Sequence, residues 1–325
     1  MPAPELFSDS LTFARIVFRL RAAGCVFAED EARLLLSEAS STLELTEWLD
    51  RRVAGEPLEY ILGWAEFCGL RIAVDPGVFV PRRRTGLLVS EAVTLLQEGL
   101  TTLGLTAVGP TTEALTAPAG TPVTPPTPRM PPTPCMPLTP RPTLTPAGIV
   151  VDLCCGSGAV GVAIASRVPG VQLHAADIDP VAVSCGRRNV TKVGGQIYQG
   201  DLYSALPSKI RGRVRLLAVN APYVPTGALY TMPLEARNYE PRVSLDGGTD
   251  GLDLHRRVIA EAAEWLAPGG HLLIETSERQ AAGTAAIMAA AGFAVRTVHS
   301  DELDGTVVIG SAPRRSPRAP GHHLS

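Results

Sequence analysis

The sequence predicts an α/β fold: a mostly parallel sheet covered by helices on both faces and preceded by a small helical unit. Short apolar runs alternate with helical patterns from residue 148 to residue 310. This alternation is typical of parallel strands joined by right-handed helical crossovers. A glycine-rich turn follows the first of these runs, and the carboxyl ends of the strands are where such sheets bind ligands.

The composition limits the classes of protein to consider. The chain has 325 residues, 45% hydrophobic and 19% charged, and a formal net charge of -3. These values fit one large and one small globular domain, and the charge argues against non-specific nucleic-acid binding. The cysteines lack zinc-ligand spacing, so we expect no metal site. Neither a leader peptide nor an apolar run of about 18 residues is evident, so we expect a cytoplasmic protein.

The N-terminal segment is predicted to form helices and a hairpin. In residues 8–54 apolar side chains recur at helical spacing, which indicates short amphipathic helices. Residues 60–64 and 70–74 are short apolar segments with glycines around them, and they predict the two strands of a hairpin. Residues 85–98 predict another helix.

Proline and threonine dominate residues 101–147. Proline has no backbone N–H and disfavours helix at the residue before it, so we expect no packed element there. We interpret the segment as a disordered linker, with a docking site for a proline-recognising module as the alternative. The basic tail of residues 313–325 is also expected to be disordered.

The elements after the linker follow in regular order. We predict strands at residues 148–153, 171–176, 196–199, 214–219, 271–275, 294–299 and 306–310. We predict helices at residues 159–167, 180–193, 253–265 and 279–290. Because helices separate most consecutive strands, these strands are expected to lie parallel.

A ligand site is predicted at the end of the first of these strands. There the sequence reads D-L-C-C-G-S-G, so that a carboxylate at Asp152 is followed by glycines. Glycines allow a ligand to approach the backbone closely, and the strand-ending carboxylate can receive an ammonium group. The predicted loop site comprises Asp152, Cys154, Cys155, Gly156, Ser157 and Gly158.

The next two strand ends supply groups that suit a nucleoside. Asp177 ends the second strand, where a carboxylate can accept both ribose hydroxyls, and Ile178 beside it can pack on adenine. Asp201 and Leu202 follow the third strand, where the adenine amino group and ring edge are expected. A nucleoside that also carries a cationic tail matches S-adenosyl-L-methionine, which we predict as the cofactor.

Two other interpretations of the glycine loop remain open. Residues 156–161 also satisfy G-x-G-x-x-G, the dinucleotide pattern. A dinucleotide site places a pyrophosphate at the helix N-terminus, and Asp152 would repel that group. The loop can also be a purely structural turn.

The segment N-A-P-Y at the end of the fourth strand predicts an acceptor site at the same edge of the sheet. An amide nitrogen is a poor nucleophile because its lone pair is delocalised. The Asn220 side-chain oxygen and the Ala221 carbonyl oxygen can accept hydrogen bonds from both N–H groups of the amide and stabilise the positive charge that develops on its nitrogen. Pro222 stiffens the backbone that presents this carbonyl, and the Tyr223 ring can pack against the planar amide group. Asn220 is also expected to border the cofactor. Asparagine and proline can alternatively be turn formers only.

These motifs resemble those of the HemK/PrmC family, the protein N5-glutamine methyltransferases that modify peptide-chain release factors. Residues 56–82, from E-P-L-E-Y-I-L-G-W to V-P-R, resemble the family's hairpin. E-P-R-V-S-L-D-G-G-T-D-G-L at residues 240–252 is the second discriminating stretch. D-L-C-C-G-S-G, A-D-I-D-P, N-A-P-Y and A-P-G-G-H-L-L-I-E stand in family order. Nucleic-acid adenine methyltransferases share only the N-P-P-Y type segment.

The resemblance implies a Rossmann-like class I S-adenosylmethionine methyltransferase sheet with a small helical N-terminal domain that docks a protein substrate. It implies that residues 220–223 clamp a glutamine. It also implies a release factor as partner, and we expect a monomer without stable nucleic-acid binding. We divide the chain into a helical docking domain (1–55), a hairpin and connecting helix (56–100), a linker (101–147), a catalytic domain (148–312) and a tail (313–325).

Three departures from the family pattern stand out. Ala221 replaces a proline, Cys154 replaces a glycine, and arginines follow Pro81 where the family has acidic residues. The arginines are expected to lie in a solvated loop or to meet a partner's phosphates or carboxylates. Two alternatives follow: nitrogen methylation of a nucleic-acid base or another amide, or an inactive cofactor-binding module.

Overall fold

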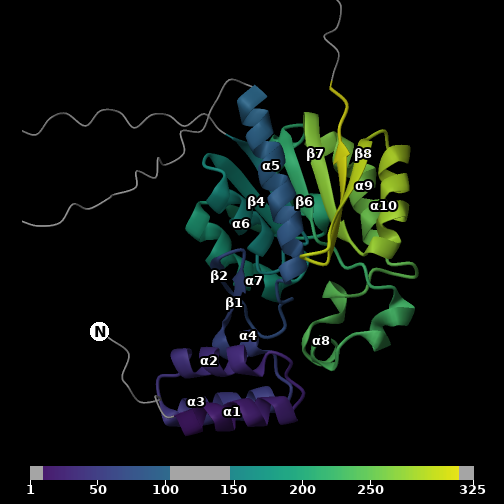
Figure 1. Ribbon diagram of the computed structural model, residues 1–325. Coiled ribbons are helices and arrows are strands. Elements are labelled where there is room, and N and C mark those ends of the chain that lie inside the picture. Colours follow the sequence, from purple (N-terminus) through teal and green to yellow (C-terminus); the bar gives the residue numbers. More distant parts are fainter. Residues whose placement is uncertain (1–9, 103–146, 315–325) are drawn as a thin grey trace, which may run out of the picture.

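The computed structural model describes residues 10–102 and 147–314. Figure 1 shows a central sheet with helices on both sides and a separate helical unit beyond one end of its strands. The predicted linker lies outside the described residues from 103 to 146, and the predicted tail does so from 315 onward.

The sheet has seven strands in the order β5-β4-β3-β6-β7-β9-β8. Their bounds are β3 (Gly148–Leu153), β4 (Val171–Asp177), β5 (Gln196–Gln199), β6 (Val214–Val219), β7 (Leu266–Thr276), β8 (Ala294–Ser300) and β9 (Gly305–Ser311). The first five in this order pair in parallel, and β9 runs antiparallel to both of its neighbours. The predicted doubly covered, mostly parallel sheet is therefore confirmed.

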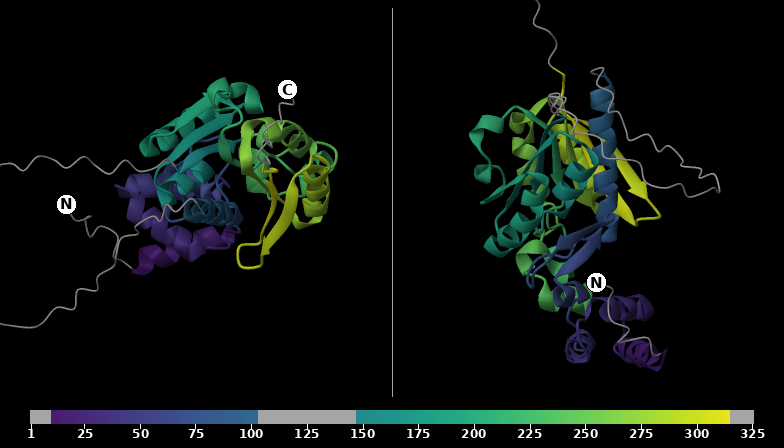
Figure 2. Two further views of the ribbon diagram at one scale, coloured as in Figure 1. Left: turned by 90° about the horizontal axis from the view of Figure 1, so that it is seen from above. Right: turned by 90° about the vertical axis from the view of Figure 1, so that its left-hand side faces the viewer.

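Alternate residues of the strands belong to two separate cores, one on each face. Val150 of β3 packs with α5 and α6, whereas Val151 packs in the core that contains α9. α5, α6 and α7 cover the first face, and α9 and α10 cover the second (Figure 2). The helices are α5 (Gly86–Thr102), α6 (Ala159–Arg167), α7 (Pro180–Val190), α8 (Leu234–Tyr239), α9 (Asp253–Trp265) and α10 (Glu278–Ala290).

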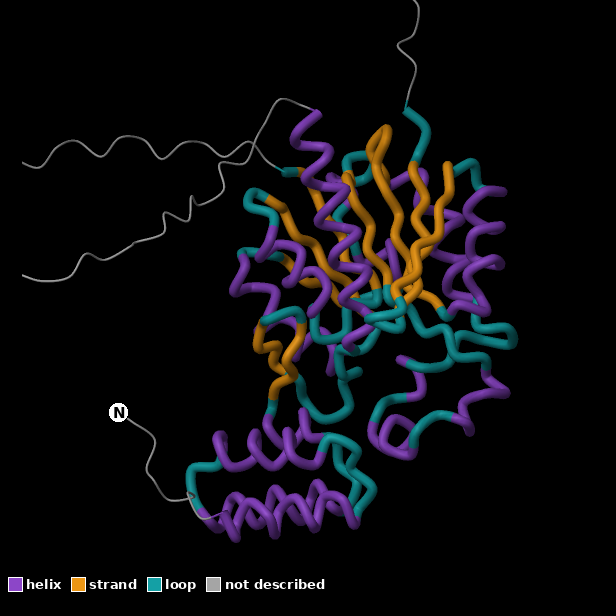
Figure 3. The backbone as a smooth tube through the Cα atoms, in the orientation of Figure 1, coloured by secondary structure: helices purple, strands orange, loops and turns teal. Residues whose placement is uncertain are grey.

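The strand order reverses next to β3. The chain steps from β3 to β4 and β5 on one side and then crosses back to β6 and β7 on the other. Such a switch point leaves a crevice beyond the carboxyl ends of the two central strands. Figure 3 shows loops gathered at this edge of the sheet, between the strands and the helical unit.

The helical unit consists of α1 (Ser10–Ala22), α2 (Ala28–Glu38) and α3 (Thr42–Val53). These helices are amphipathic, as predicted, and bury one apolar stripe each. Ser41 caps α3 by accepting a hydrogen bond from the backbone N–H of Glu44 at 3.2 Å. The shared core includes Ile16, Leu20, Leu35, Leu45 and Leu49.

Ion pairs attach the helical unit to the catalytic part of the chain. Arg52 of α3 is buried and pairs with Glu31 of α2 at 2.7 Å and with Glu235 of α8 at 3.2 Å. Arg71 of the hairpin pairs with Glu38 of α2 at 2.7 Å. The unit therefore contacts both the hairpin and the α8 segment.

The first strand of the predicted hairpin was placed wrongly. Residues Leu58–Leu62 form the short helix α4, and the hairpin consists of β1 (Trp64–Phe67) and β2 (Leu70–Ala73). Pro57 precedes α4, where its fixed φ suits a helix start, and Gly63 ends it with φ 77°. A short apolar run does not by itself distinguish strand from helix.

Some element boundaries also differ from the prediction. β7 starts at Leu266 instead of residue 271, because the A-P-G-G segment forms a bulge opposite Val214 and Leu216. α5 continues to Thr102, so the last residues of this helix were wrongly assigned to the linker. α7 ends at Val190 and is followed by a short 3-10 turn.

Candidate active site

A cavity of about 350 Å³ opens at the carboxyl ends of the central strands. It brings together the predicted cofactor and acceptor segments, although they come from separate strand ends. The predicted site residues that line it are Asp152, Cys154, Cys155, Gly156, Ser157, Asp177, Ile178, Asp201, Leu202, Asn220, Ala221, Pro222 and Tyr223. Gly158 is not among the lining residues. It precedes α6 as its N-cap with φ 76°.

Cys154, which replaces a glycine of the family pattern, adopts a backbone conformation that favours glycine. Cys154 has φ 55°, in the left-handed region, a conformation that costs a non-glycine residue on the order of 1 kcal/mol. Gly156 has φ 54°, and a Cβ built on it would meet no protein atom within 4 Å. The space beside Gly156 is therefore open to a ligand.

Asp152 is buried below the glycine loop. Its Oδ2 accepts a hydrogen bond from the backbone N–H of Gly161 at 2.8 Å, and the residue is 2% exposed. Burial raises the pKa of this carboxyl to about 8. A cation bound beside it would favour the ionised form and lower that pKa.

Asp177 is oriented by two backbone groups. Its Oδ2 accepts from the N–H of Gly156 at 2.8 Å, and its Oδ1 accepts from the N–H of Asp179 at 3.0 Å. Burial raises the pKa of Asp177, while these hydrogen bonds oppose the rise. The fixed carboxylate suits a pair of neighbouring hydroxyls, and the exposed side chain of Ile178 on the cavity wall suits a flat ring.

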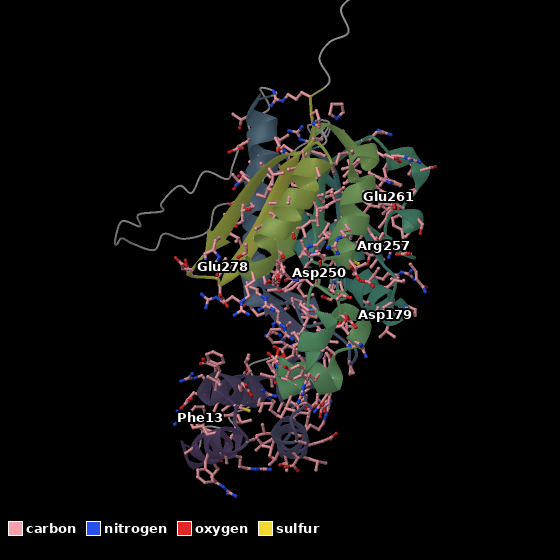
Figure 4. All side chains as sticks on the ribbon, turned by 90° about the vertical axis from the view of Figure 1, so that its right-hand side faces the viewer. Phe13, Asp179, Asp250, Arg257, Glu261 and Glu278 are labelled. Carbon is pink, nitrogen blue, oxygen red and sulfur yellow. The ribbon has the colours of Figure 1, made fainter. Side chains whose placement is uncertain are left out.

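Asp201 has a partner that sequence reasoning missed. Its Oδ2 accepts a hydrogen bond from Arg257 of α9 at 2.7 Å, and both side chains are about half exposed. Leu202 next to it is buried with φ 48° and starts a 3-10 turn. Figure 4 labels Arg257 and Asp179, which both line the cavity, on the same side of the molecule.

Asn220 directly follows β6 and is held by the segment before α5. Its Nδ2 donates a hydrogen bond to the Thr85 hydroxyl at 3.3 Å. Among the described residues its Oδ1 makes no hydrogen bond, so this oxygen is the group left to accept one from a ligand. Thr85 also lines the cavity.

The D-G-G-T-D-G-L stretch supports the backbone of N-A-P-Y. A Cβ on Gly247 would lie 2.7 Å from Tyr223 Cα and 2.8 Å from Pro222 O, and one on Gly251 would collide with Tyr223 O. The N–H of Gly247 donates to Val224 O at 2.8 Å. The glycines of this stretch therefore permit an approach that a side chain would block.

Gln280 of α10 adds a side-chain contact to the same backbone. Its Nε2 donates to Tyr223 O at 2.8 Å and to Asp250 O at 3.0 Å. The Tyr223 hydroxyl donates to Glu275 at 3.5 Å, and burial raises the pKa of Tyr223 to about 12. Tyr223 is thus fixed at both its backbone and its ring.

The arginines after Pro81 follow the expectation of a solvated loop only in part, because Arg83 is exposed whereas Arg82 and Arg84 contact buried carboxylates. Arg82 forms an ion pair with the buried carboxylate of Glu240, the first residue of the E-P-R stretch. Arg84 lines the cavity, and its Nε lies 3.6 Å from Glu275 Oε1. Arg83 is exposed. The two discriminating sequence stretches therefore contact each other.

Asn189 of α7 joins the hairpin to the glycine loop and was also missed. Its Oδ1 accepts from the N–H of Ala73 at 3.0 Å, and its Nδ2 donates to the carbonyls of Ala73 and Ser157, both at 2.9 Å. Asn189 is buried. The sequence gives no signal for this role of Asn189, because a single asparagine in a helix does not indicate which residues it will contact.

The described residues contain neither a membrane span nor a cluster of metal ligands. No helix in the two described ranges is long and apolar enough to cross a membrane. Within residues 10–102 and 147–314, no group of three or more histidine, cysteine or acidic side chains is arranged to hold a metal ion.

The sheet order and the cavity at its switch point define a class I methyltransferase fold, and comparison with known proteins agrees. Residues 138–228 match the family model described as "Methyltransferase small domain". The chain is 32% identical to the release factor glutamine methyltransferase of Geobacter sulfurreducens over 75% of this chain and 68% of that protein. It is 30% identical to the Bifidobacterium longum protein of the same name over 87% of this chain and 92% of that protein.

The chain belongs to the release factor glutamine methyltransferase family. A third relative has another name and another substrate. The 4-amino-L-phenylalanine/4-methylamino-L-phenylalanine methyltransferase of Streptomyces pristinaespiralis is 33% identical over 75% of this chain and 69% of that protein. The family resemblance inferred from the motifs is confirmed.

Proposed function

We propose that this protein transfers a methyl group from S-adenosyl-L-methionine to the side-chain amide nitrogen of a glutamine in a peptide-chain release factor. One observation carries the proposal: Asn220, with its amide oxygen free of protein partners among the described residues, lines the same cavity as Gly156 and Asp177. Membership of the family supports the choice of acceptor.

The residues of the cavity fit the proposed cofactor. We propose that Asp177 binds the ribose hydroxyls and Asp152 the ammonium group, and that the open space at Gly156 lets the ligand approach the backbone; the hydrogen bonds that orient both carboxylates support this assignment. Ile178 and Leu202 supply apolar walls for the adenine. When bound, S-adenosylmethionine supplies a methyl group activated by a positively charged sulfur.

The acceptor residues act by holding and orienting. The side-chain oxygen of Asn220 and the carbonyl oxygen of Ala221 each accept a hydrogen bond from one N–H group of the substrate amide. These two hydrogen bonds orient the amide nitrogen toward the methyl group of the cofactor. Both acceptors stabilise the positive charge that develops on nitrogen during transfer. Tyr223 limits the movement of the planar amide group. The nitrogen–methyl bond forms as the sulfur–methyl bond breaks, and the extra proton then passes from the nitrogen to water, so no base is required in the first step.

Replacement of the usual proline by Ala221 does not remove the backbone carbonyl. Ala221 is buried, and the following residues are supported by Gly247 and Gln280. This support compensates for the loss of the rigidity that a proline at position 221 would have provided. We therefore propose an active enzyme and not an inactive binding module.

The helical unit is proposed to dock the protein substrate. It carries large exposed apolar side chains at Phe18, Phe27 and Leu43, and its ion pairs with α8 and the hairpin hold it beside the cavity edge. Alanine at all three positions should raise KM for a protein acceptor with little change in kcat. We further propose a cytoplasmic monomer that binds no nucleic acid.

The direct test is methyl transfer from radiolabelled S-adenosylmethionine into a full-length release factor. We expect label in the release factor only while its acceptor glutamine is intact. Label that persists after this glutamine is replaced would contradict the proposal. Nuclease sensitivity of the product would instead indicate a nucleic-acid acceptor.

A small aromatic amine is the second candidate acceptor. The position of Arg84 in the cavity favours this candidate. This guanidinium lines the cavity, and its Nε has no hydrogen-bond partner among the described residues. It can pair with the carboxylate of a free amino acid, and the Streptomyces relative is named for such a substrate. A mass increase of 4-amino-L-phenylalanine after incubation with enzyme and cofactor would select this candidate.

A further inference from the structure

One buried arginine joins the helical unit to a wall of the cavity. Arg52 of α3 is 9% exposed, and its guanidinium donates two hydrogen bonds to Glu31 of α2, at 2.7 Å and 3.1 Å. These bonds use Nε and Nη2, so they fix the plane of the guanidinium. Its Nη1 donates to the carbonyl of Glu56 at 2.9 Å and to Glu235 of α8 at 3.2 Å. The position of Glu235 is therefore set relative to α2 and α3.

α8 belongs to a stretch of chain that forms one wall of the cavity. Met232 before this helix, and Pro241 and Val243 after it, line the cavity. Figure 1 shows α8 beyond the same end of the strands as the helical unit. The wall and the helical unit are neighbours, and they meet where Arg52 pairs with Glu235.

The other end of α8 is held by a different element. Arg82, which follows the hairpin, forms an ion pair with the buried carboxylate of Glu240. Removal of the Glu235 side chain leaves this second ion pair in place, and it leaves Arg52 paired with Glu31. No buried charge then becomes unpaired, which is the usual reason why breaking a buried ion pair unfolds a protein. A substitution at Glu235 therefore tests the spacing of the two parts while the fold is kept.

Exposed apolar side chains lie on both sides of this contact. Phe27 directly precedes α2, which carries Glu31, and it is 68% exposed; Leu234 is next to Glu235 and is 65% exposed. A protein that docks on the helical unit and also places a side chain in the cavity spans this junction. When two binding places have a fixed spacing, the second contact becomes intramolecular, and its effective concentration falls once the spacing varies.

We propose that Arg52 is a positioning residue that holds the helical unit and the α8 wall at the spacing a protein acceptor needs to dock and to enter the cavity at once. The inference rests on the proposed function, in which the helical unit docks the acceptor. Arg52 does not line the cavity, so it acts through Glu235 and α8. A substrate that only enters the cavity should not depend on this contact.

The first test compares two acceptors in the full-length enzyme: an intact release factor and a short peptide of its sequence around the acceptor glutamine. We expect Glu235→Ala to raise KM for the release factor by about tenfold, because docking and entry no longer act together. KM for the peptide, and kcat for both acceptors, should stay within about twofold of wild type. Glu235→Gln keeps an oxygen that can accept from Arg52, so its KM for the release factor should rise by no more than about threefold.

Hydrogen exchange of the free enzyme gives a readout that needs no acceptor. In Glu235→Ala the backbone amides of α8 should exchange about tenfold faster, and those of α10 should keep their wild-type rates. Glu261→Ala is the matched control, because it removes an exposed glutamate from α9. This control should change neither the exchange of α8 nor KM for either acceptor.

The proposal is overturned if Glu235→Ala leaves KM for the release factor or the exchange of α8 unchanged. It is also overturned if KM rises equally for the release factor and the peptide, because the contact would then only support the cavity. If the wild-type enzyme methylates neither acceptor, the proposed function fails, and the exchange of α8 alone decides whether Arg52 holds the wall.

Discussion

The two halves of the cavity are built in different ways. On the cofactor side, the groups proposed to touch the ligand are oriented by neighbouring strand ends, as when the backbone N–H of Gly156 donates to Asp177, although Asn189 adds a longer-range contact to the hairpin. On the acceptor side, Asn220 depends on Thr85, which lies 135 residues earlier, and Tyr223 depends on Gln280, which lies 57 residues later. The binding of cofactor and the orientation of acceptor should therefore fail independently when single residues are changed.

The acceptor half should respond most strongly to loss of Gly251. This glycine has φ 77°, and a Cβ on it would collide with Tyr223 O. We expect Gly251→Ala to displace the clamp backbone and lower kcat by about 100-fold, the cost of a small misplacement at the reacting atoms. The Kd for cofactor, measured by calorimetry, should change little.

Gly227→Ala is the matched control for this substitution. A Cβ on Gly227 would meet no protein atom within 4 Å, and its φ is not in the left-handed region. Normal kcat in Gly227→Ala with a loss in Gly251→Ala supports the account. Equal kcat in both variants would show that the glycine stretch does not support the clamp.

The cofactor half should depend on Asn189. Asn189→Ala removes three hydrogen bonds that join Ala73 to Ser157 through α7, and it leaves buried backbone groups unpaired. We expect the free energy of unfolding to fall by about 3 kcal/mol. Because the glycine loop loses its anchor, the Kd for cofactor should rise by about tenfold. A urea titration and a calorimetric titration check the two effects, and unchanged cofactor affinity would contradict the second.

Cofactor affinity should also depend on pH through Asp152. Burial raises the pKa of this carboxyl to about 8, and a bound ammonium group favours its ionised form. Lowering the pH below about 8 should therefore weaken binding, by at most about tenfold per pH unit for one linked proton. Asp152→Asn should bind weakly at every pH between 6 and 9. A wild-type Kd that is constant across this range would show that Asp152 does not receive the ammonium.

The smallest effect is expected from Arg257. Its ion pair with Asp201 is about half exposed, and such pairs contribute on the order of 0.5 kcal/mol. Arg257→Gln should raise the Kd for cofactor by no more than about threefold and leave kcat unchanged. A larger loss of affinity would mean that Arg257 contacts the cofactor directly.

Much of the cofactor half could be predicted from the sequence, because each motif lies within one segment. Gly156 follows its strand directly and Asp177 ends the next one, and parallel strands bring their carboxyl ends to one edge. The supports of the clamp could not be predicted in this way. Thr85, Glu275 and Gln280 acquire their roles from contacts between distant segments, and nothing in their local sequence names the partner.

The error in the hairpin has a related cause. Residues 60–62 are apolar and lie beside a glycine, which fits the end of a strand as well as the last turn of a helix. The structure places Ile61 in the core of the helical unit and Tyr60 against the hairpin. Because Tyr60 and Ile61 pack against two different neighbours, the helix is favoured over a strand. The local sequence does not reveal these neighbours.

The central claim is that Asn220, although it borders the cofactor, acts chiefly by holding the acceptor amide. The most direct measurement is kcat together with the cofactor Kd for Asn220→Ala, beside the control Asn238→Ala on the exposed face of α8. We predict a loss of kcat of about 100-fold with the Kd within about twofold of wild type, and a normal control. An Asn220→Ala enzyme with wild-type turnover, or one that no longer binds cofactor, would contradict the claim.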